Sequence, residues 1–293
     1  MKLRSKVRPL KAGLLAGAAW SAYRWGGRVG RRPSFVLHYR IPNWGDVVNP
    51  RFVSLATGRR FCGLDIEARD LLRDHTGRTM PNVSCMGSIL SHVDEGTLVW
   101  GTGLDKEVAP KRRPREIRAV RGPLTRRVLL QAGIEAPEVY GDPALLLPRI
   151  LPRVAVEARY ELGIVAHYKH DARDPMLRKL TEDPRCTLIS MRSGGWDVVQ
   201  KIRSCRRIVS TSLHGLILAD AYWIPSYWIQ RSRLVQGGNP FKFHDYFGSL
   251  GSEQAEPLVV DGETTVETLM DACAARPLNI DLDALWRARP IDV

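Results

Sequence analysis

The chain has 293 residues, 44% of them apolar, and a formal net charge of +13. The apolar content excludes an intrinsically disordered protein, and the length allows one large domain or two domains of ordinary size. Five scattered cysteines show no CxxC pattern and no Cys/His ligand spacing. This pattern favours reduced thiols and argues against a metal site.

The positive charge is concentrated at the N-terminus. Residues 1–32 contain nine Lys and Arg and no Asp or Glu, which leaves a net charge of +4 for residues 33–293. The apolar run at 12–23 is too short to span a bilayer, which takes about 20 residues. The arm fits a helix on an anionic membrane surface, a solvated tail or a signal peptide. We expect no nucleic-acid partner, because no recognised binding module follows the basic run.

The first half of the chain alternates strands and helices. A helix is expected over 47–57, and 116–133 is expected to form a strand, a turn and a helix, with Pro123 in the first helical turn and Gly133 ending the helix. Strands that run into turns are expected near residues 34–40, 79–93, 96–103 and 138–148.

The pattern restarts after a proline-containing linker at 148–160. Strands are expected at 162–168, 186–191, 206–212 and 225–230, and helices at 194–205, 213–223 and 263–276. Such alternation indicates βαβ units and parallel sheets. We therefore predict an α/β protein with two Rossmann-like domains that face each other across a cleft. The predicted division is a basic arm at 1–32, an N-terminal domain at 33–150 and a C-terminal domain at 151–293 that ends in a helix.

The stretch STSLHGLILADAY, residues 210–222, places polar residues where a predicted strand ends and a helix begins. In open α/β sheets, ligands bind outside the carboxyl ends of the strands. Free N–H groups and the helix dipole favour an anion there. Thr211 and Ser212 add hydroxyl donors, His214 adds a donor and a proton, and Gly215 allows close approach to the backbone. The alternative is that His214 only caps the helix or packs between domains.

Other predicted strand ends carry similar chemistry. Asn43 and Asp46 follow the first strand, where Asp46 fits a hydroxyl ligand, a base or a helix N-cap. Gly103 belongs to a small-residue turn, and Asp142 to a Gly-Asp-Pro turn that suits a structural carboxylate. Arg121 fits a carboxylate or phosphate ligand, or an ordinary surface arginine.

A polar cluster follows the first strand of the second half. It contains His167, Tyr168, Lys169 and His170. We expect some of these four side chains to contact a ligand and the others to be bystanders.

Together these motifs resemble the polysaccharide pyruvyltransferase family over residues 34 to about 250. The motifs that carry the resemblance are NWGD (43–46), MGSIL (86–90), WGTG (100–103), VRGPLT (120–125), YGDPALLLP (140–148), IVAHYKH (164–170), STSLHGLILADAY (210–222) and FKFHDYFGSL (241–250).

The resemblance implies a fold similar to GT-B glycosyltransferases. It also implies phosphoenolpyruvate as donor, a saccharide as acceptor, free or lipid-linked, and a pyruvate ketal as product with release of phosphate. Neither a cofactor nor a metal is expected. The bacterial exopolysaccharide branch of the family fits best. We expect a cytoplasmic protein. Residues 1–32 could in addition bring it into contact with the inner face of the cytoplasmic membrane.

The chemistry of such a transfer suggests roles for the candidates. His214 is expected to act as general acid/base or phosphate ligand, His167 is the second candidate, and Asp46 is expected to serve the acceptor side. Arg121 is expected to bind one anion of the donor. Some family members have an arginine two positions before the motif histidine.

In this chain the position two before His214 is Ser212, so Lys169, Arg231 or Lys242 would have to supply the positive charge that binds phosphate. Two rival functions remain open from the sequence: a GT-B-type nucleotide-sugar glycosyltransferase and a non-catalytic saccharide-binding protein.

Overall fold

The structure is a computed structural model. It describes residues 13–24, 26, 33–151, 154–169, 174–192, 194–231, 240–252 and 256–293. Most of the basic arm, including residues 1–12 and 27–32, lies outside the described residues.

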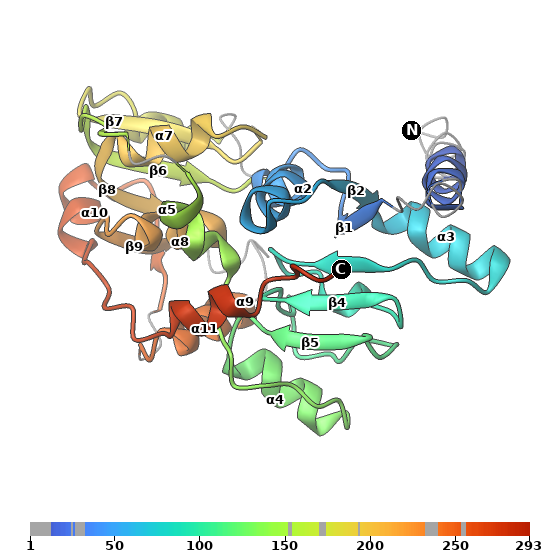
Figure 1. Ribbon diagram of the computed structural model, residues 1–293. Helices are drawn as coiled ribbons and strands as arrows, with labels where there is room; N and C mark the ends of the chain where they lie inside the picture. Colours follow the sequence, from blue (N-terminus) through green and yellow to red (C-terminus); the bar gives the residue numbers. More distant parts are fainter. Residues whose placement is uncertain are drawn as a thin grey trace.

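The first half of the chain builds a five-stranded parallel sheet in the order β2-β1-β3-β4-β5 (Figure 1). Its strands are β1 (Ser34–His38), β2 (Phe61–Asp65), β3 (Asn82–Ser84), β4 (Thr97–Trp100) and β5 (Glu116–Ala119). The helices and turns between them are α2 (Trp44–Thr57), α3 (Ile66–Thr76), η1 (Leu90–His92) and α4 (Pro123–Gln131). Strands β3 and β4 are buried throughout, including the polar side chains of Asn82, Ser84 and Thr97.

The second half builds another five-stranded parallel sheet, in the order β10-β9-β8-β6-β7. Its strands are β6 (Tyr160–Ala166), β7 (Cys186–Ser190), β8 (Cys205–Ser210), β9 (Ser226–Gln230) and β10 (Leu258–Val259). Its helices include α6 (Pro175–Leu180), α7 (Asp197–Arg203), α8 (Leu213–Ala221) and α10 (Val266–Ala272). Numbered from the first strand of each half, both sheets have the order 2-1-3-4-5, so the two halves share one topology.

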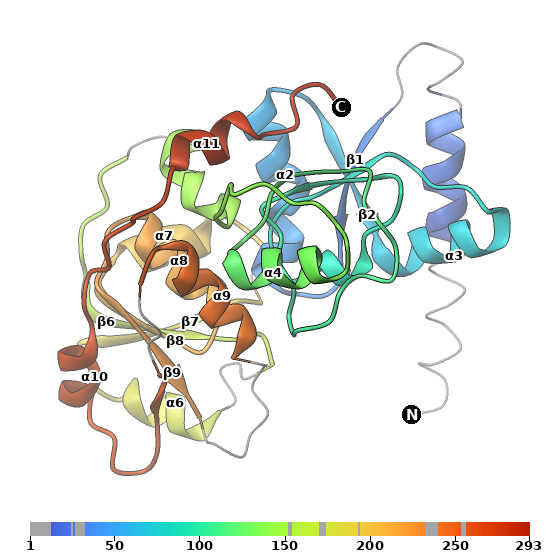
Figure 2. The same ribbon diagram turned by 90° about the horizontal axis from the view of Figure 1, so that it is seen from below.

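Two helices tie the second half back to the first. Helix α9 (Phe241–Ser249) packs against α4, and α11 (Leu282–Arg287) packs against the short turn η2 (Pro143–Leu146), as Figure 2 shows from below. The indole N–H of Trp100 donates to the carbonyl of Leu285 at 2.9 Å. Helix α5 (Leu147–Ile150) follows η2 directly. The largest apolar core cluster contains residues of both halves, so the two sheets share a core.

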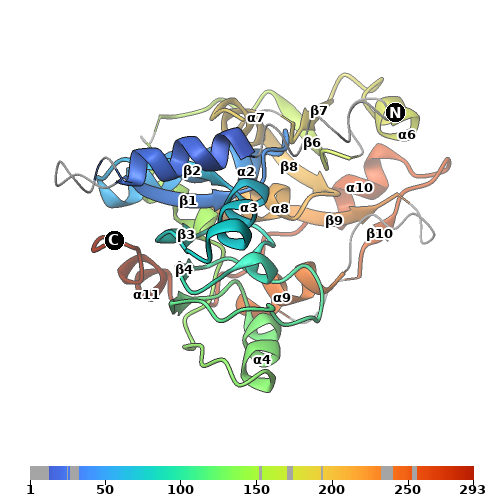
Figure 3. The ribbon, with the colours of Figure 1, turned by 90° about the vertical axis from the view of Figure 1, so that its right-hand side faces the viewer.

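A helix at residues 13–24 lies against the first half, on the side away from the second sheet (Figures 1 and 3). Ala16 is buried against Leu64, Leu72 and Met80, whereas Leu14 is 76% exposed. Within the part of the chain that the structure describes, no helix is both long and apolar enough to cross a bilayer.

The prediction of an α/β protein with parallel strands is confirmed. Pro123 begins α4, and Gly133 follows that helix with a φ of 70°, as its position in the sequence suggested. The sequence did not indicate β2 and α3, whose residues 61–76 carry many charges and little alternation. The predicted division at residue 150 remains a prediction, and α9 and α11 contact the first half across it.

Candidate active site

Both sheets bring loops to one place through the same feature of their topology. In a 2-1-3-4-5 sheet, the chain turns to opposite sides after strands 1 and 3, which leaves a crevice at their carboxyl ends. In the first sheet these strands are β1 and β3, and in the second they are β6 and β8. The loops that follow all four strands line one pocket.

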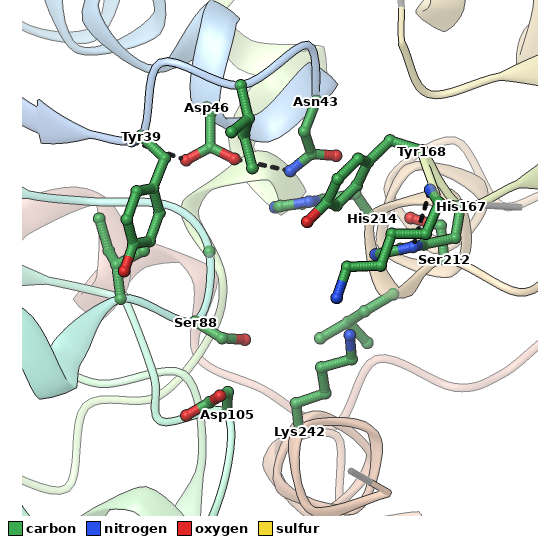
Figure 4. A pocket seen from close by; sticks show the side chains of 15 residues that line it. Tyr39, Asn43, Asp46, Ser88, Asp105, His167, Tyr168, Ser212, His214 and Lys242 are labelled. Carbon is green, nitrogen blue, oxygen red and sulfur yellow. Dashed lines mark hydrogen bonds between the residues drawn. The ribbon is translucent and has the colours of Figure 1, made fainter. Parts of the chain in front are cut away.

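The pocket has a volume of about 240 Å³. Figure 4 shows Tyr39, Asp46, Ser88 and Asp105 on one side and Tyr168, His167 and Ser212 on the other, with Lys242 reaching in from α9. Its lining residues are Tyr39, Ile41, Asn43, Asp46, Gly87, Ser88, Ile89, Asp105, His167, Tyr168, Lys169, Ser212, Leu213, His214 and Lys242. The first half therefore supplies the acids and the second half supplies the amines.

The start of α2 fixes Asp46. Asn43 is the N-cap residue, so Asp46 lies in the first helical turn and is not itself the cap. The Asp46 carboxylate accepts hydrogen bonds from the Asn43 amide at 2.7 Å and from the Tyr39 backbone N–H at 3.1 Å. Burial raises the pKa of Asp46, and the two hydrogen bonds and the nearby His214 offset part of that rise. A carboxylate with a raised pKa is a better proton acceptor.

The same helix start docks on the second half. The Trp44 backbone N–H donates to the Met191 carbonyl at 2.8 Å, and the Trp44 indole donates to the Gly195 carbonyl at 3.1 Å. A Cβ on Gly45 would lie 2.2 Å from Cε1 of His214. Position 45 therefore has to be glycine for the imidazole to lie where it does.

His214 lies in the first turn of α8 and lines the pocket together with Leu213, and it is 8% exposed. Its ring packs edge-on against Trp44, with the ring centroids 5.7 Å apart. Burial lowers the pKa of His214, the acids Asp142 and Asp46 oppose this, and Lys242 and Arg121 reinforce it. The neutral imidazole is therefore favoured near neutral pH.

The β6 and β8 loops are tied to each other. The Thr211 hydroxyl accepts a hydrogen bond from the His167 backbone N–H at 2.9 Å. Thr211 itself is buried and does not line the pocket, so it positions the loop that carries His167 and Lys169. Ser212, by contrast, lines the pocket directly.

Two amines enter the pocket from the second half. Lys169 follows β6, and Lys242 comes from the first turn of α9. Burial lowers the pKa of Lys242 to about 8, and repulsion from Arg121 and Lys169 contributes to the fall while Asp105 opposes it. Lys242 is therefore a cation below about pH 8 and would gain from an anionic ligand.

Arg121 is not part of the pocket lining. It is fully buried, and its guanidinium forms a salt bridge to Asp245 of α9 at 2.9 Å. It also donates to the hydroxyl of Ser88 at 2.7 Å and to the carbonyl of Leu104 at 2.5 Å. Arg121 is thus neither a surface arginine nor part of the pocket lining. It does hold Ser88 in place, and Ser88 lines the pocket.

Four other candidates also lie outside the lining. A Cβ on Gly103 would meet Arg121, and one on Gly215 would meet the Ser210 hydroxyl, so both glycines allow close packing within the protein. Arg231 forms a salt bridge to Asp174 at 2.7 Å. Asp142 caps η2 through the backbone N–H of Ala144 at 3.0 Å, which agrees with a structural carboxylate, and its other oxygen lies 3.7 Å from His214.

Sequence reasoning missed Tyr39 and Asp105. Tyr39 directly follows β1, and Asp105 lies two residues after the WGTG turn, so a place near a strand or turn end was the only local signal for either residue. The Tyr39 hydroxyl lies 2.6 Å from Nε2 of His92, and burial raises the pKa of Tyr39 to about 12. Among the described residues, no three His, Cys, Asp or Glu side chains are grouped so that they could hold a metal ion.

Comparison with known proteins shows which family the chain resembles. Residues 96–233, which include β4 to β9 and most of the second-half loops, match the family model described as polysaccharide pyruvyl transferase. Over these residues the chain resembles this family. The predicted resemblance is confirmed.

Two curated relatives match part of this chain. It is 30% identical over 178 residues to an uncharacterized protein of Acanthamoeba polyphaga mimivirus, which covers 59% of this chain and 62% of that protein. It is 32% identical over 158 residues to the succinoglycan biosynthesis protein ExoV of Rhizobium meliloti, which covers 53% of this chain and 48% of that protein. The chain thus spans less than two thirds of the length of either relative.

Proposed function

We propose that this protein transfers the pyruvyl group of phosphoenolpyruvate to two hydroxyls of a saccharide, forming a ketal and releasing phosphate. One observation carries the proposal: a single pocket at the strand ends of both sheets combines two amines, two imidazoles and two carboxylates. The family match and the resemblance to a succinoglycan biosynthesis protein support it. The proposed arrangement is GT-B-like, two Rossmann-like domains that face each other across a cleft.

Donor binding is assigned to the side of the second half. Phosphoenolpyruvate carries a carboxylate and a phosphate, and Lys169, Lys242 and the start of α8 offer cations and backbone N–H groups. With Arg121 engaged by Asp245, the two lysines take over the anion-binding role that the sequence suggested for arginine. Ser212 adds a hydroxyl at the start of α8.

The reaction needs an acid and a base on opposite sides of the central carbon. The methylene carbon gains a proton from His214, which acts in its imidazolium form, and positive charge develops at the central carbon. One sugar hydroxyl then bonds to that carbon and gives its proton to Asp46. The second hydroxyl forms the other C–O bond as the C–O bond to phosphate breaks, and phosphate takes up the second proton. The proton on Asp46 then returns to His214 through solvent, which restores both groups for the next turnover. His167 is the reserve candidate for either proton transfer.

The test is an acceptor screen. The protein is incubated with phosphoenolpyruvate and saccharide acceptors, free and lipid-linked. We expect release of phosphate together with a pyruvyl mass gain on the sugar. His214→Gln should abolish both signals. The matched control His75→Gln, at an exposed position on α3, should keep them. Thermal stabilisation by a nucleotide sugar, and none by phosphoenolpyruvate, would instead favour a glycosyltransferase.

We also propose that the N-terminal arm contacts an anionic membrane surface on the cytoplasmic side. The nine basic residues of 1–32 and the exposed Leu14 support this. Deleting the arm is a poor test, because Ala16 is part of a buried cluster. Charge removal is better, and the positions to change to Gln are Lys2, Arg4, Lys6, Arg8 and Lys11.

Each basic residue near an anionic surface contributes roughly 1 kcal/mol. The charge-removed variant should therefore bind vesicles of phosphatidylglycerol and phosphatidylcholine more than 100-fold more weakly than the unmodified protein. Vesicles of phosphatidylcholine alone serve as the control. Equal binding of both proteins to the anionic vesicles would contradict the membrane contact.

A further inference from the structure

Two buried polar atoms at the edge of the pocket face each other without a partner. They are Oδ2 of Asp142 and Nε2 of His214, which lie 3.7 Å apart, and neither forms a hydrogen bond among the described residues. Asp142 is fully buried, and His214 is 8% exposed. A buried carboxylate oxygen without a donor is costly, so such an atom calls for a functional explanation.

Asp142 and His214 are each held in place by neighbours other than one another. Oδ1 of Asp142 caps η2 by accepting from the N–H of Ala144 at 3.0 Å, which aims Oδ2 toward α8. The imidazole of His214 is confined between the indole of Trp44 and the Cα of Gly45. The remaining gap exceeds a hydrogen bond by about half an ångström, and catalytic hydrogen bonds are often long before the substrate binds.

We propose that Asp142 is a positioning residue that accepts the Nε2 proton of His214 and leaves Nδ1 as the nitrogen that exchanges a proton with the ligand. The proposal rests on the proposed function, because it assigns the geometry of its general acid. Since Nε2 has almost no exposed surface, Nδ1 is the ring nitrogen left to serve the pocket. The proton that moves is the one on Nδ1, and no proton is transferred to Asp142.

Charged groups from four places surround His214. Asp142 of η2 and Asp46 of α2 favour the imidazolium, while Lys242 of α9 and Arg121 after β5 disfavour it. Asp46 is already held by Asn43 and Tyr39, and Arg121 is paired with Asp245. Asp142 is therefore the acid whose free oxygen is available to the ring.

The first test observes the imidazole without catalysis. In protein labelled with ¹⁵N-histidine, the His214 signals are assigned by their loss in His214→Gln. Neutral His214 should show a protonated Nε2 and an unprotonated Nδ1. Asp142→Asn keeps the shape and the capping oxygen but removes the charge, so the proton affinity of His214 should fall about tenfold or more and its titration midpoint should move to lower pH. An unchanged tautomer and midpoint would overturn the pairing.

The second test separates positioning from folding. Asp142→Asn should lower kcat at least 100-fold while the KM for phosphoenolpyruvate changes less than threefold. Asp281→Asn, the same change at the N-cap of α11 and outside the pocket lining, is the matched control and should leave kcat unchanged. A normal kcat in Asp142→Asn would overturn the positioning role. If the unmodified protein turns over no phosphoenolpyruvate, the proposed function fails, and the spectrum still decides the pairing.

Discussion

At the scale of single residues, the position of the His214 imidazole requires a glycine at position 45. A Cβ on Gly45 would lie 2.2 Å from Cε1 of the ring, which is too close for both atoms to be present. Gly45 belongs to the first half and His214 to the second, so one glycine lets the two halves meet at the candidate acid. The NWGD motif thus has three functions. Trp44 docks on the second half through hydrogen bonds, Gly45 leaves space for the His214 ring, and Asp46 supplies a carboxylate to the pocket.

Gly45→Ala should displace the His214 ring. Overpacking of this kind typically costs 1–3 kcal/mol, and a misplacement of about 1 Å in a catalytic group can lower the rate about 100-fold. We expect kcat to fall by that order while the protein stays folded, as measured by phosphate release and chemical denaturation. Gly262→Ala, where a Cβ has nothing within 4 Å, is the control. An active Gly45→Ala protein would show that the ring need not lie there.

The lowered pKa of Lys242 gives a prediction about pH. Its protonated form is lost as pH rises through about 8, well below the usual range for lysine. Affinity for phosphoenolpyruvate should therefore fall as pH rises from 7 to 9. In Lys242→Met, KM should be at least tenfold higher at pH 7 and should lose this pH dependence. Lys179→Met, outside the pocket, should retain the wild-type profile of KM against pH. A flat wild-type profile would rule out Lys242 as a donor ligand.

At the scale of elements, α9 is the part that carries Lys242 from the second half to the pocket. Asp245 fixes this helix to α4, because its carboxylate accepts from the Thr125 N–H and hydroxyl, both at 2.7 Å, and pairs with Arg121. Gly122 allows this contact, since a Cβ there would collide with the Asp245 carbonyl. The VRGPLT motif is therefore a docking site for α9.

Asp245→Ala should be strongly destabilising, because it leaves the guanidinium of Arg121 buried without its partner. Breaking a buried pair in this way costs about 3–5 kcal/mol. The measurement is the free energy of unfolding in urea. Asp283→Ala, which removes an exposed pair with Arg149, should change it by about 0–1 kcal/mol. Similar values for the two variants would contradict the anchoring role of Asp245.

These elements show where sequence reasoning works and where it ends. The strand–turn–helix units and the polar turns at strand ends were predictable, because periodicity and turn residues are local signals. The partner of Arg121 was not, since Asp245 lies 124 positions away and only packing brings them together. The same argument applies to Tyr39 and Asp105, whose place in the pocket depends on how the two halves meet.

At the scale of the whole molecule, the two sheets repeat one strand order, and their crevices at strands 1 and 3 open on one pocket. A sheet of this order can bind a ligand at its own crevice. Among the residues that line the pocket, the first half contributes the carboxylates, and the second half contributes the two amines and the two imidazoles. A reaction that joins a doubly anionic donor to a hydroxyl acceptor suits such a division.

The shared core predicts that the two halves unfold together. The main apolar cluster spans both sheets, α9 and α11 pack back onto the first half, and Trp44 bonds to the second. Calorimetry should therefore show one transition whose calorimetric and van't Hoff enthalpies agree, the signature of a two-state process. Two resolved transitions would mean that each sheet is stable alone. The pocket would then depend on docking, and phosphoenolpyruvate would be expected to raise the midpoints of both transitions.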